Sequence, residues 1–287
     1  MKPFQYHEPT TVKEACQLIA THWKKACVLA GGTDLIIKMK KGVILPEHVI
    51  NIKKIPELNG ISETSDGFKI GSITSLSAIA NHEGIKAKQP MVGEAALTVG
   101  SLQVRNLATL GGNLCNGAPS ADMAPGLLVL DSLITLSGVN GDRKMKLEEF
   151  FVGPGEVNLK KGEILKELFV PFPDKDMRMI YLKHGPRRAM DCALVGVAVA
   201  LVLKNSGQQC ESAKIALGAV APTPVRAKKS EKLLSGKSVK DFPIQEIKKM
   251  LLTEIAPISD VRASATYRAE MISSLTLKAI ENLVNLN

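Results

Sequence analysis

Aromatic side chains are scarce in this chain of 287 residues, where one Trp, three Tyr and seven Phe make up 4% of the sequence. Proteins that hold single-stranded nucleic acid stack its bases on aromatic side chains along a basic groove. The basic pairs here form no such stripe, since they are scattered at positions 40–41, 53–54, 160–161, 228–229 and 248–249. We therefore expect no nucleic-acid partner. The formal net charge of +9 indicates a solvated basic surface, or attraction of an anionic cofactor or an acidic partner subunit.

Cysteine pairs with metal-binding spacing are also lacking. The five cysteines, Cys16, Cys27, Cys115, Cys192 and Cys210, form no C-x-x-C motif, so we expect no zinc or iron–sulfur ligation within this chain. Their odd number and apolar neighbours are typical of reduced thiols in a cytosolic protein. The five histidines show no metal-ligand spacing either. The sequence thus predicts no metal site.

No apolar run is long enough for a membrane helix, which needs about 20 residues. The longest run, residues 193–203, is short and rich in Val, and this pattern predicts a buried strand. The N-terminal residues 1–7 lack the apolar region of a secretory signal peptide. We expect a cytoplasmic protein without a membrane span.

The common nucleotide fingerprints G-x-G-x-x-G and G-x-x-x-x-G-K-[ST] are absent from the two stretches that carry paired glycines, residues 26–36 and 109–122. In the first, a short apolar strand leads into Gly31-Gly32, and in the second Gly111-Gly112 lies between polar residues. Glycine lets a backbone approach a bulky group closely, and the free N–H groups of a turn that opens a helix suit an anion. Two such turns could clamp one diphosphate. The alternative is a pair of plain surface turns.

Apolar runs and helical periodicity predict an order of elements. Thr11 and Glu14 have capping-box spacing, Ser75 is a second candidate N-cap, and Asn205-Ser206-Gly207 is typical of a hairpin turn. Residues 173–176 are the best candidate for a linker. The expected strands are residues 26–30, 48–52, 67–73, 133–137, 163–170, 179–184, 194–203 and 213–220, and the expected helices include 34–40, 75–80, 91–99, 123–130, 244–254 and 263–286.

Five motifs in order along the chain resemble the FAD-binding medium subunit of the molybdenum hydroxylases, the family of xanthine dehydrogenase and carbon monoxide dehydrogenase. The two glycine stretches resemble its FAD loops. The other three resemble the segment that leads into the second loop, the start of the C-terminal domain and the last helix. The motifs are residues 30–35, 99–106, 109–122, 187–191 and 260–268.

This resemblance implies an α+β fold with three domains. Residues 1–57 would be the N-terminal FAD-binding lobe, and residues 58–175 the second lobe of the two-lobed fold of the vanillyl-alcohol-oxidase/MurB (PCMH) type. Residues 176–287 would be a C-terminal domain like that of the CO dehydrogenase flavoprotein, with a three-stranded antiparallel sheet and a helix bundle.

The resemblance also implies the activity of an FAD-dependent oxidoreductase subunit. The chain would bind FAD non-covalently and pass electrons from the [2Fe–2S] clusters of a small partner subunit to NAD⁺ or another acceptor. The molybdenum cofactor would lie on a large partner subunit. Two alternatives are a free-standing FAD oxidoreductase of the same fold and a scaffold that has lost FAD. The lack of an evident acid–base pair beside the glycine loops weakens the first alternative, and the intact glycine loops weaken the second.

The family pattern also implies a set of FAD-binding residues and no catalytic residue. Both loops would contact the diphosphate and flavin through backbone N–H groups. Asp122 would make a polar contact, Val99 would pack near the flavin ring, Leu165 would offer a backbone contact and Lys183 would lie near the flavin's polar edge. The full set is Leu29, Ala30, Gly31, Gly32, Thr33, Asp34, Leu35, Ile36, Val99, Gly100, Thr109, Gly111, Gly112, Asn113, Asp122, Leu165 and Lys183.

Structural roles compete with these assignments at four positions. Asp34 and Asp122 each precede an expected helix, where Asp is a favoured N-cap. Lys183 could be a surface lysine on a strand edge. For Cys115, a small buried filler is favoured over a redox thiol.

Overall fold

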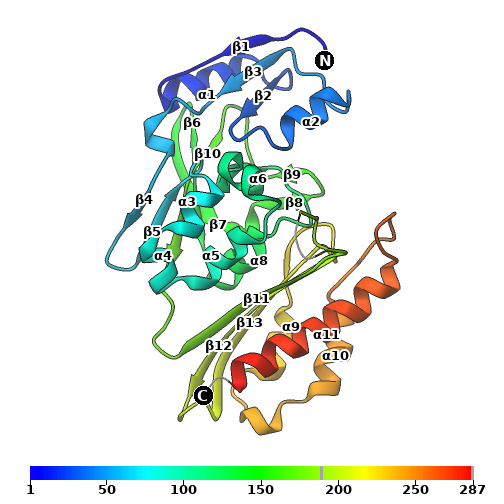
Figure 1. Cartoon of the computed structure of the whole chain (residues 1–287). Coiled ribbons are helices and arrows are strands. Elements are labelled where there is room, and N and C mark those ends of the chain that lie inside the picture. Colours follow the sequence, from blue (N-terminus) through cyan, green and yellow to red (C-terminus); the bar gives the residue numbers. More distant parts are fainter. Residues whose placement is uncertain (188–189, 286–287) are drawn as a thin grey trace.

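The N-terminal sheet is the first of three larger sheets in the computed structural model, which describes residues 1–187 and 190–285 (Figure 1). It is parallel and has the order β1-β3-β2, and two short helices belong to the same region. The strands predicted at 26–30 and 48–52 are confirmed. The elements are β1 (Gln5–His7), α1 (Val12–Thr21), β2 (Ala26–Leu29), α2 (Leu35–Lys40) and β3 (His48–Asn51).

Helix α1 begins where the capping pattern predicts. The Glu14 amide donates a hydrogen bond to Thr11 Oγ1 at 3.2 Å, which satisfies one free N–H group of the first turn. The buried face of α1, with Cys16 and Ile19, packs in one cluster with Ile50 and Ile52. This small core holds the helix against the N-terminal sheet.

The middle sheet is antiparallel, with the order β4-β5-β10-β6-β7. Its central strand β10 (Ile164–Pro171) pairs with β5 on one side and β6 on the other, so it joins segments far apart in the sequence. A separate two-stranded sheet is formed by β8 and β9. The other strands are β4 (Ile61–Glu63), β5 (Gly67–Gly71), β6 (Leu133–Gly138), β7 (Gly141–Lys146), β8 (Phe151–Gly153) and β9 (Glu156–Val157).

Short helices make up the rest of the middle region. Ser75 caps α3 as predicted, because its Oγ accepts the Ala78 amide at 3.1 Å. Helices α4, α6 and α7 have six residues each, which is too short for apolar periodicity to reveal them. The helices are η1 (Pro56–Leu58), α3 (Leu76–Asn81), α4 (Glu83–Lys88), α5 (Pro90–Leu97), α6 (Leu102–Leu107), α7 (Leu110–Cys115), α8 (Met123–Val129) and η2 (Leu147–Glu149).

The third sheet is antiparallel and has three long strands, as expected, with a fourth strand of two residues at its edge. The predicted hairpin turn is confirmed, since Asn205, Ser206 and Gly207 all have positive φ between β12 and β13. The last helix, expected over 263–286, runs from Ala265 to Val284, and position 286 lies outside the described residues. The elements are β11 (Met177–His184), β12 (Val195–Lys204), β13 (Gln209–Gly218), β14 (Val225–Arg226), α9 (Lys228–Leu234), η3 (Val239–Asp241), α10 (Ile244–Thr253) and α11 (Ala265–Val284).

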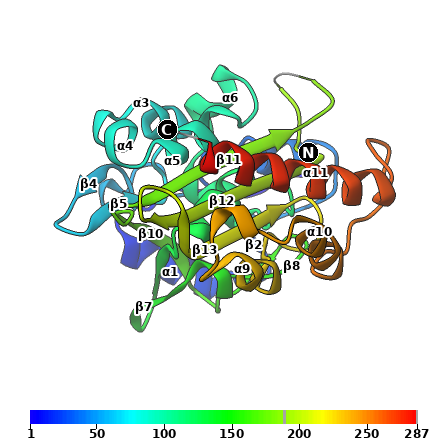
Figure 2. The same cartoon turned by 90° about the horizontal axis from the view of Figure 1, so that it is seen from below.

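Strand β12 is buried on both faces, which explains its unbroken apolar sequence. Val197 and Val199 belong to the cluster under α9–α11, whereas Ala198 and Ala200 belong to the core of the middle region. Figure 2 shows α11 crossing over β11 and β12 with α9 beside β13. The third sheet is therefore the layer between the middle region and the C-terminal helices. Among the described residues, no helix combines the length and apolar character needed to span a bilayer.

Candidate cofactor-binding site

A cavity of about 980 Å³ lies where the N-terminal, middle and C-terminal segments meet. This volume is at the upper end of the range for ligand pockets, about 300–1,000 Å³. Its wall combines the first glycine stretch, the second glycine stretch, the start of β10 and the segment after β11. Residues from four distant parts of the sequence therefore surround one space.

The first glycine loop has an unusual run of free backbone donors. Within the described parts of the chain, the amides of Gly31, Gly32, Thr33 and Asp34 make no hydrogen bond. Gly32 has a φ of +75°, which favours glycine. Successive free N–H groups in such a loop form a concavity that attracts anions. The loop thus has the donors that a diphosphate needs.

Gly31 is required for a different reason, because the two glycine stretches touch here. A Cβ atom at Gly31 would lie 2.2 Å from the backbone oxygen of Leu107 and 2.9 Å from Cα of Ala108. Backbone atoms cannot give way as a flexible side chain can. Gly31 therefore allows the first loop to approach the segment that leads into the second.

The second glycine pair corrects the sequence-based prediction. Gly111 and Gly112 lie inside the short helix α7, and neither has positive φ. Thr109 caps α7, since its Oγ1 accepts the Gly112 amide at 3.0 Å, and the amides of Gly111 and Asn113 are bonded to Ser72 O and Thr109 O. The expectation that these amides are free for a diphosphate is wrong.

The second loop instead offers side-chain atoms and space. Asn113 and Ser72 line the cavity, and their Oδ1 and Oγ atoms are buried without a hydrogen-bond partner among the described residues. A Cβ at Gly112 would lie 2.8 Å from Thr109 Oγ1, which would have to shift, and among the described residues no other atom outside the backbone of α7 lies within 4 Å. Buried polar atoms are rarely left unpaired in native proteins, and two such atoms in one wall fit a polar ligand.

A buried ionic network forms another part of the wall. Lys183 Nζ lies 2.9 Å from Asp122 Oδ2, and it also donates to the carbonyl oxygens of Thr98 at 2.9 Å and Asp191 at 3.0 Å. The Tyr181 hydroxyl donates to Asp122 Oδ1 at 2.9 Å. Burial raises the pKa of Asp122, with Lys183 opposing it, and burial beside Asp122 raises the pKa of Tyr181 well above its usual value.

Three of the four structural alternatives, those for Asp122, Asp34 and Lys183, are decided by the contacts of these side chains. Asp122 occupies the N-cap position of α8 but makes no capping hydrogen bond with its side chain, and the same holds for Asp34 at α2. The Lys183 side chain is only 9% exposed, although β11 is an edge strand. Lys183 is therefore not a surface lysine, and capping does not account for either aspartate.

Fourteen of the seventeen predicted residues line the cavity. Leu29, Ile36 and Lys183 do not line it: Leu29 and Ile36 lie beneath Gly32, and Lys183 reaches the wall through Asp122. The lining residues are Ala30, Gly31, Gly32, Thr33, Asp34, Leu35, Val99, Gly100, Thr109, Gly111, Gly112, Asn113, Asp122 and Leu165.

The set of residues predicted from the sequence omits three cationic residues that line the cavity, Lys38, Arg187 and Arg262. Lys38 Nζ donates to Asn116 Oδ1 at 2.6 Å and so connects α2 to the end of α7. Its spacing of four residues from Asp34 places both on one helical face, a signal that could have revealed it. Arg187 and Arg262 also line the cavity. Of the motif at 187–191, residues 188 and 189 lie outside the described residues.

These observations define a class: an α+β protein with a long cavity built for an extended, anionic cofactor. The chain belongs to the family described as the FAD-binding domain in molybdopterin dehydrogenase, which matches residues 2–173. The C-terminal domain of the CO dehydrogenase flavoprotein matches residues 180–283. The predicted family, the α+β class and the assignment as an FAD-binding oxidoreductase flavoprotein are thereby confirmed.

Full-length relatives support this membership. The glyceraldehyde dehydrogenase medium chain of Sulfolobus acidocaldarius is 35% identical over 98% of both chains. The xanthine dehydrogenase FAD-binding subunit of Escherichia coli O157:H7 is 33% identical and covers 97% of this chain and 95% of its own. A chain of the solved carbon monoxide dehydrogenase from Hydrogenophaga pseudoflava has a TM-score of 0.94 at 32% identity, covering 99% of this chain and 98% of that chain.

Proposed function

We propose that this chain is the flavin station of a heteromeric molybdenum hydroxylase in the cytoplasm, holding FAD non-covalently in the cavity described above. Electrons would arrive from [2Fe–2S] clusters of a small subunit and leave to NAD⁺ or another acceptor, while a large subunit carries the molybdenum cofactor. Relatives named as medium chains and FAD-binding subunits support the division among subunits. The observation that carries the proposal is the run of unbonded amides at 31–34 beside the cavity.

The chain's own residues would bind and orient the cofactor. The amides from Gly31 to Asp34 would hold the diphosphate, and the unpaired Asn113 Oδ1 and Ser72 Oγ would meet its polar groups. Bound FAD supplies the redox chemistry, which side chains alone cannot supply. The proposed binding set is the one predicted from the sequence, with Ser72 and Lys38 added. The boundaries at residues 57 and 175 belong to the same proposal.

The Asp122–Lys183 pair would present a fixed charge pattern to the cofactor. Lys183 has three oxygen partners within 3.0 Å, so its ammonium group is held in one position. Because Asp122 lines the cavity, the pair can orient a polar edge of the flavin without side-chain motion. Preorganised charge of this kind tunes a bound group at no reorganisation cost.

Two of the three cysteines that line the cavity, Cys27 and Cys115, support non-covalent binding, and the third, Cys192, is exposed. Burial raises the pKa of Cys115 to about 12 and raises that of Cys27. A protonated thiol is a poor nucleophile, so neither thiol is activated to attack a flavin. This agrees with the prediction that Cys115 is a filler rather than a redox thiol.

The test is the flavin content of the purified chain. We expect about one FAD per chain, all of it released into the supernatant when the protein is denatured by acid, because polar contacts and packing hold it. Absorbance of the supernatant measures the released FAD, and mass spectrometry of the pellet detects flavin that stays attached to the protein. Flavin that stays on the denatured protein contradicts non-covalent binding, and a chain that takes up no FAD on reconstitution contradicts the proposed function.

A further inference from the structure

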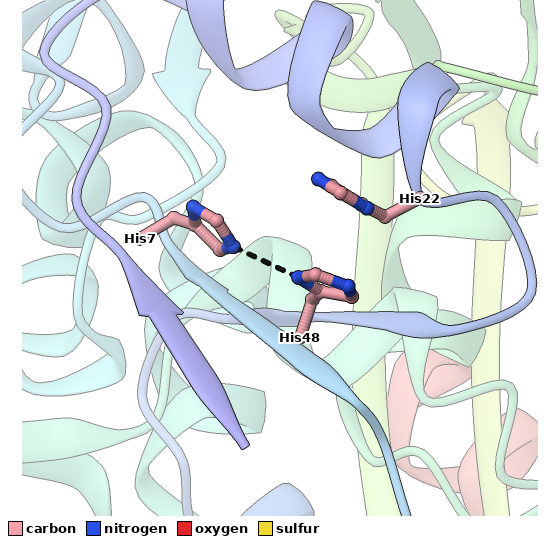
Figure 3. A group of neighbouring side chains, drawn as sticks. All are labelled: His7, His22 and His48. Atoms are coloured by element: carbon pink, nitrogen blue, oxygen red, sulfur yellow. Dashed lines mark hydrogen bonds between the residues drawn. The ribbon is translucent and has the colours of Figure 1, made fainter.

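Three of the five histidines come together in the N-terminal region, although their sequence spacing is irregular. His7 ends β1, His22 is the C-cap residue of α1 and His48 begins β3. Figure 3 shows the three rings grouped where these elements meet. None of the three lines the large cavity, so the cluster is separate from the proposed flavin site.

The ring nitrogens of the cluster are within coordinating reach of one another. His7 Nε2 and His48 Nδ1 are 3.0 Å apart and share a hydrogen bond. The rings of His22 and His48 stack with centroids 3.6 Å apart and an angle of 21° between their planes. One ligand nitrogen from each of the three histidines lies within 4.8 Å of the other two. A zinc ion with nitrogen ligands at about 2.0–2.1 Å in a tetrahedral site separates those nitrogens by roughly 3.3 Å.

We propose that His7, His22 and His48 form a binding site for a divalent late first-row transition metal, with Zn²⁺ as the reference ion. Three imidazole nitrogens are a ligand set that suits such ions, and water would complete the coordination. Sequence spacing predicts no metal site because the three positions become neighbours only when β1, α1 and β3 pack together.

Two rearrangements would let the metal-free cluster bind the ion. The donor of the His7–His48 hydrogen bond would shift its proton to its other ring nitrogen, so both facing nitrogens become ligands. His22 must turn out of its stacked position. His7 and His22 are half-buried, which leaves room for that rotation and for a water ligand.

The metal would act as a cross-link within the N-terminal region. It would join β1, the end of α1 and β3, in a region whose core cluster is small, with eight buried apolar residues among the described ones, including Ile164 of β10. A ligand that binds the folded chain alone stabilises it in proportion to the logarithm of its concentration over Kd. We therefore expect a structural site rather than a catalytic one.

The experiment uses the full-length, FAD-loaded chain after chelator treatment and desalting. Equilibrium dialysis with ZnSO₄ and metal analysis should give about one Zn²⁺ per chain. The same chain with CoCl₂ should show the visible absorption of four- or five-coordinate Co²⁺ with nitrogen ligands. The melting temperature should rise with free zinc, while the FAD content stays the same.

Matched variants identify the ligands. His22→Gln leaves the His7–His48 hydrogen bond in place and should weaken zinc binding at least about tenfold. His82→Asn is the histidine control, since His82 caps α4 and Asn is also a good cap. Cys192→Ser controls for zinc captured by the exposed thiol. Both controls should bind zinc as the wild type does.

Two outcomes overturn the proposal. One is zinc binding that is unchanged in His22→Gln or lost in Cys192→Ser, which would place the metal elsewhere. The other is a wild-type chain that takes up no Zn²⁺ or Co²⁺. Either outcome leaves the flavin proposal untouched, because flavin content is measured separately.

Discussion

Single glycines in the two loops serve different physical purposes. A Cβ at Gly31 would collide with the Leu107 carbonyl at 2.2 Å, so Gly31 permits contact between two backbones. Gly32 supplies a φ of +75°. Gly112 has helical backbone and lines the cavity, and its missing Cβ leaves room for Thr109 Oγ1, which would lie 2.8 Å from it. The same residue type thus contributes packing, backbone conformation and cavity volume within one site.

Gly112→Leu should abolish FAD binding while the fold persists. A helical backbone accepts leucine, although its Cβ would displace Thr109 Oγ1, 2.8 Å away, and the rest of the side chain would fill the space that we assign to the cofactor. We expect the affinity to fall by at least about two decades, or roughly 2.8 kcal/mol. Flavin absorbance per chain after desalting measures the loss, and circular dichroism checks the fold.

The control for this variant is Gly153→Leu. Gly153 lies in β8 outside the cavity, has no positive φ, and a Cβ there would approach only the Glu156 side chain, at 3.6 Å or more. Gly42 is less suitable because its φ of +69° would add backbone strain. A fully yellow Gly112→Leu protein would show that α7 does not border the cofactor.

Between elements, one ion pair ties β7 to the loop before β10. Arg143 contacts Glu163 through two bonds, Nε–Oε1 at 2.7 Å and Nη2–Oε2 at 2.8 Å. The Lys160 amide also donates to Glu163 Oε2 at 2.7 Å. The hydrogen bonds from Arg143 lower the pKa of Glu163 below its ordinary 4.5. Because Glu163 lines the cavity, this pair also shapes the wall beside Leu165.

Glu163→Gln should lower the free energy of unfolding by about 1.5–3 kcal/mol at pH 7, the usual value of hydrogen bonds to a charged group. The pKa of Glu163 is lower in the folded state, so its contribution is present above the unfolded pKa near 4.5 and is lost as pH falls through the folded value. The difference in the free energy of unfolding between wild type and Glu163→Gln should therefore shrink at acid pH. Urea unfolding of the FAD-free chain from pH 7 to pH 3 measures it.

An exposed ion pair provides the control for this measurement. Glu83 pairs with Lys86 at 2.9 Å, but both side chains are largely in solvent. Glu83→Gln should leave the free energy of unfolding nearly unchanged at any pH, because solvent screens an exposed pair. If the free energy of unfolding of Glu163→Gln stays below that of wild type by the same amount from pH 7 to pH 3, the ionic explanation is contradicted.

At the scale of the whole molecule, the regions together surround one cavity, which we assign to FAD. The third sheet supplies Lys183, the middle region supplies Asp122, and the N-terminal loop supplies the free amides. Among the described residues, one group of side chains could hold a metal ion, and it consists of His7, His22 and His48. The described architecture is thus that of a flavin carrier.

The isolated chain should hydroxylate no purine, aldehyde or aromatic substrate, because we assign the molybdenum and iron–sulfur centres to partner subunits. Dye reduction with each substrate class, together with metal analysis, provides the measurement. The complex purified with its partners serves as the positive control. Substrate-driven hydroxylation by a chain shown to lack molybdenum would support the free-standing oxidoreductase instead.

The sequence by itself determined what depends on local chemistry. Thr11 and Ser75 predicted helix starts because capping acts over three residues. The apolar run at 193–203 predicted a buried strand because an unbroken run of apolar side chains avoids water on both faces. The glycine loops and the family motifs were recognisable in the same way. The three-region order of strands and helices followed from these local signals.

Only the tertiary structure decided which groups face each other and which donors stay free. The amide of Gly111 is bonded to Ser72 O and those of Gly112 and Asn113 are bonded to Thr109, while the amides at 31–34 remain unbonded. Lys183 is buried because the edge of its sheet meets Thr98 and Asp122. His7, His22 and His48 meet because two parallel strand pairings and one helix end bring them together. Such contacts depend on long-range packing, which sequence spacing does not encode.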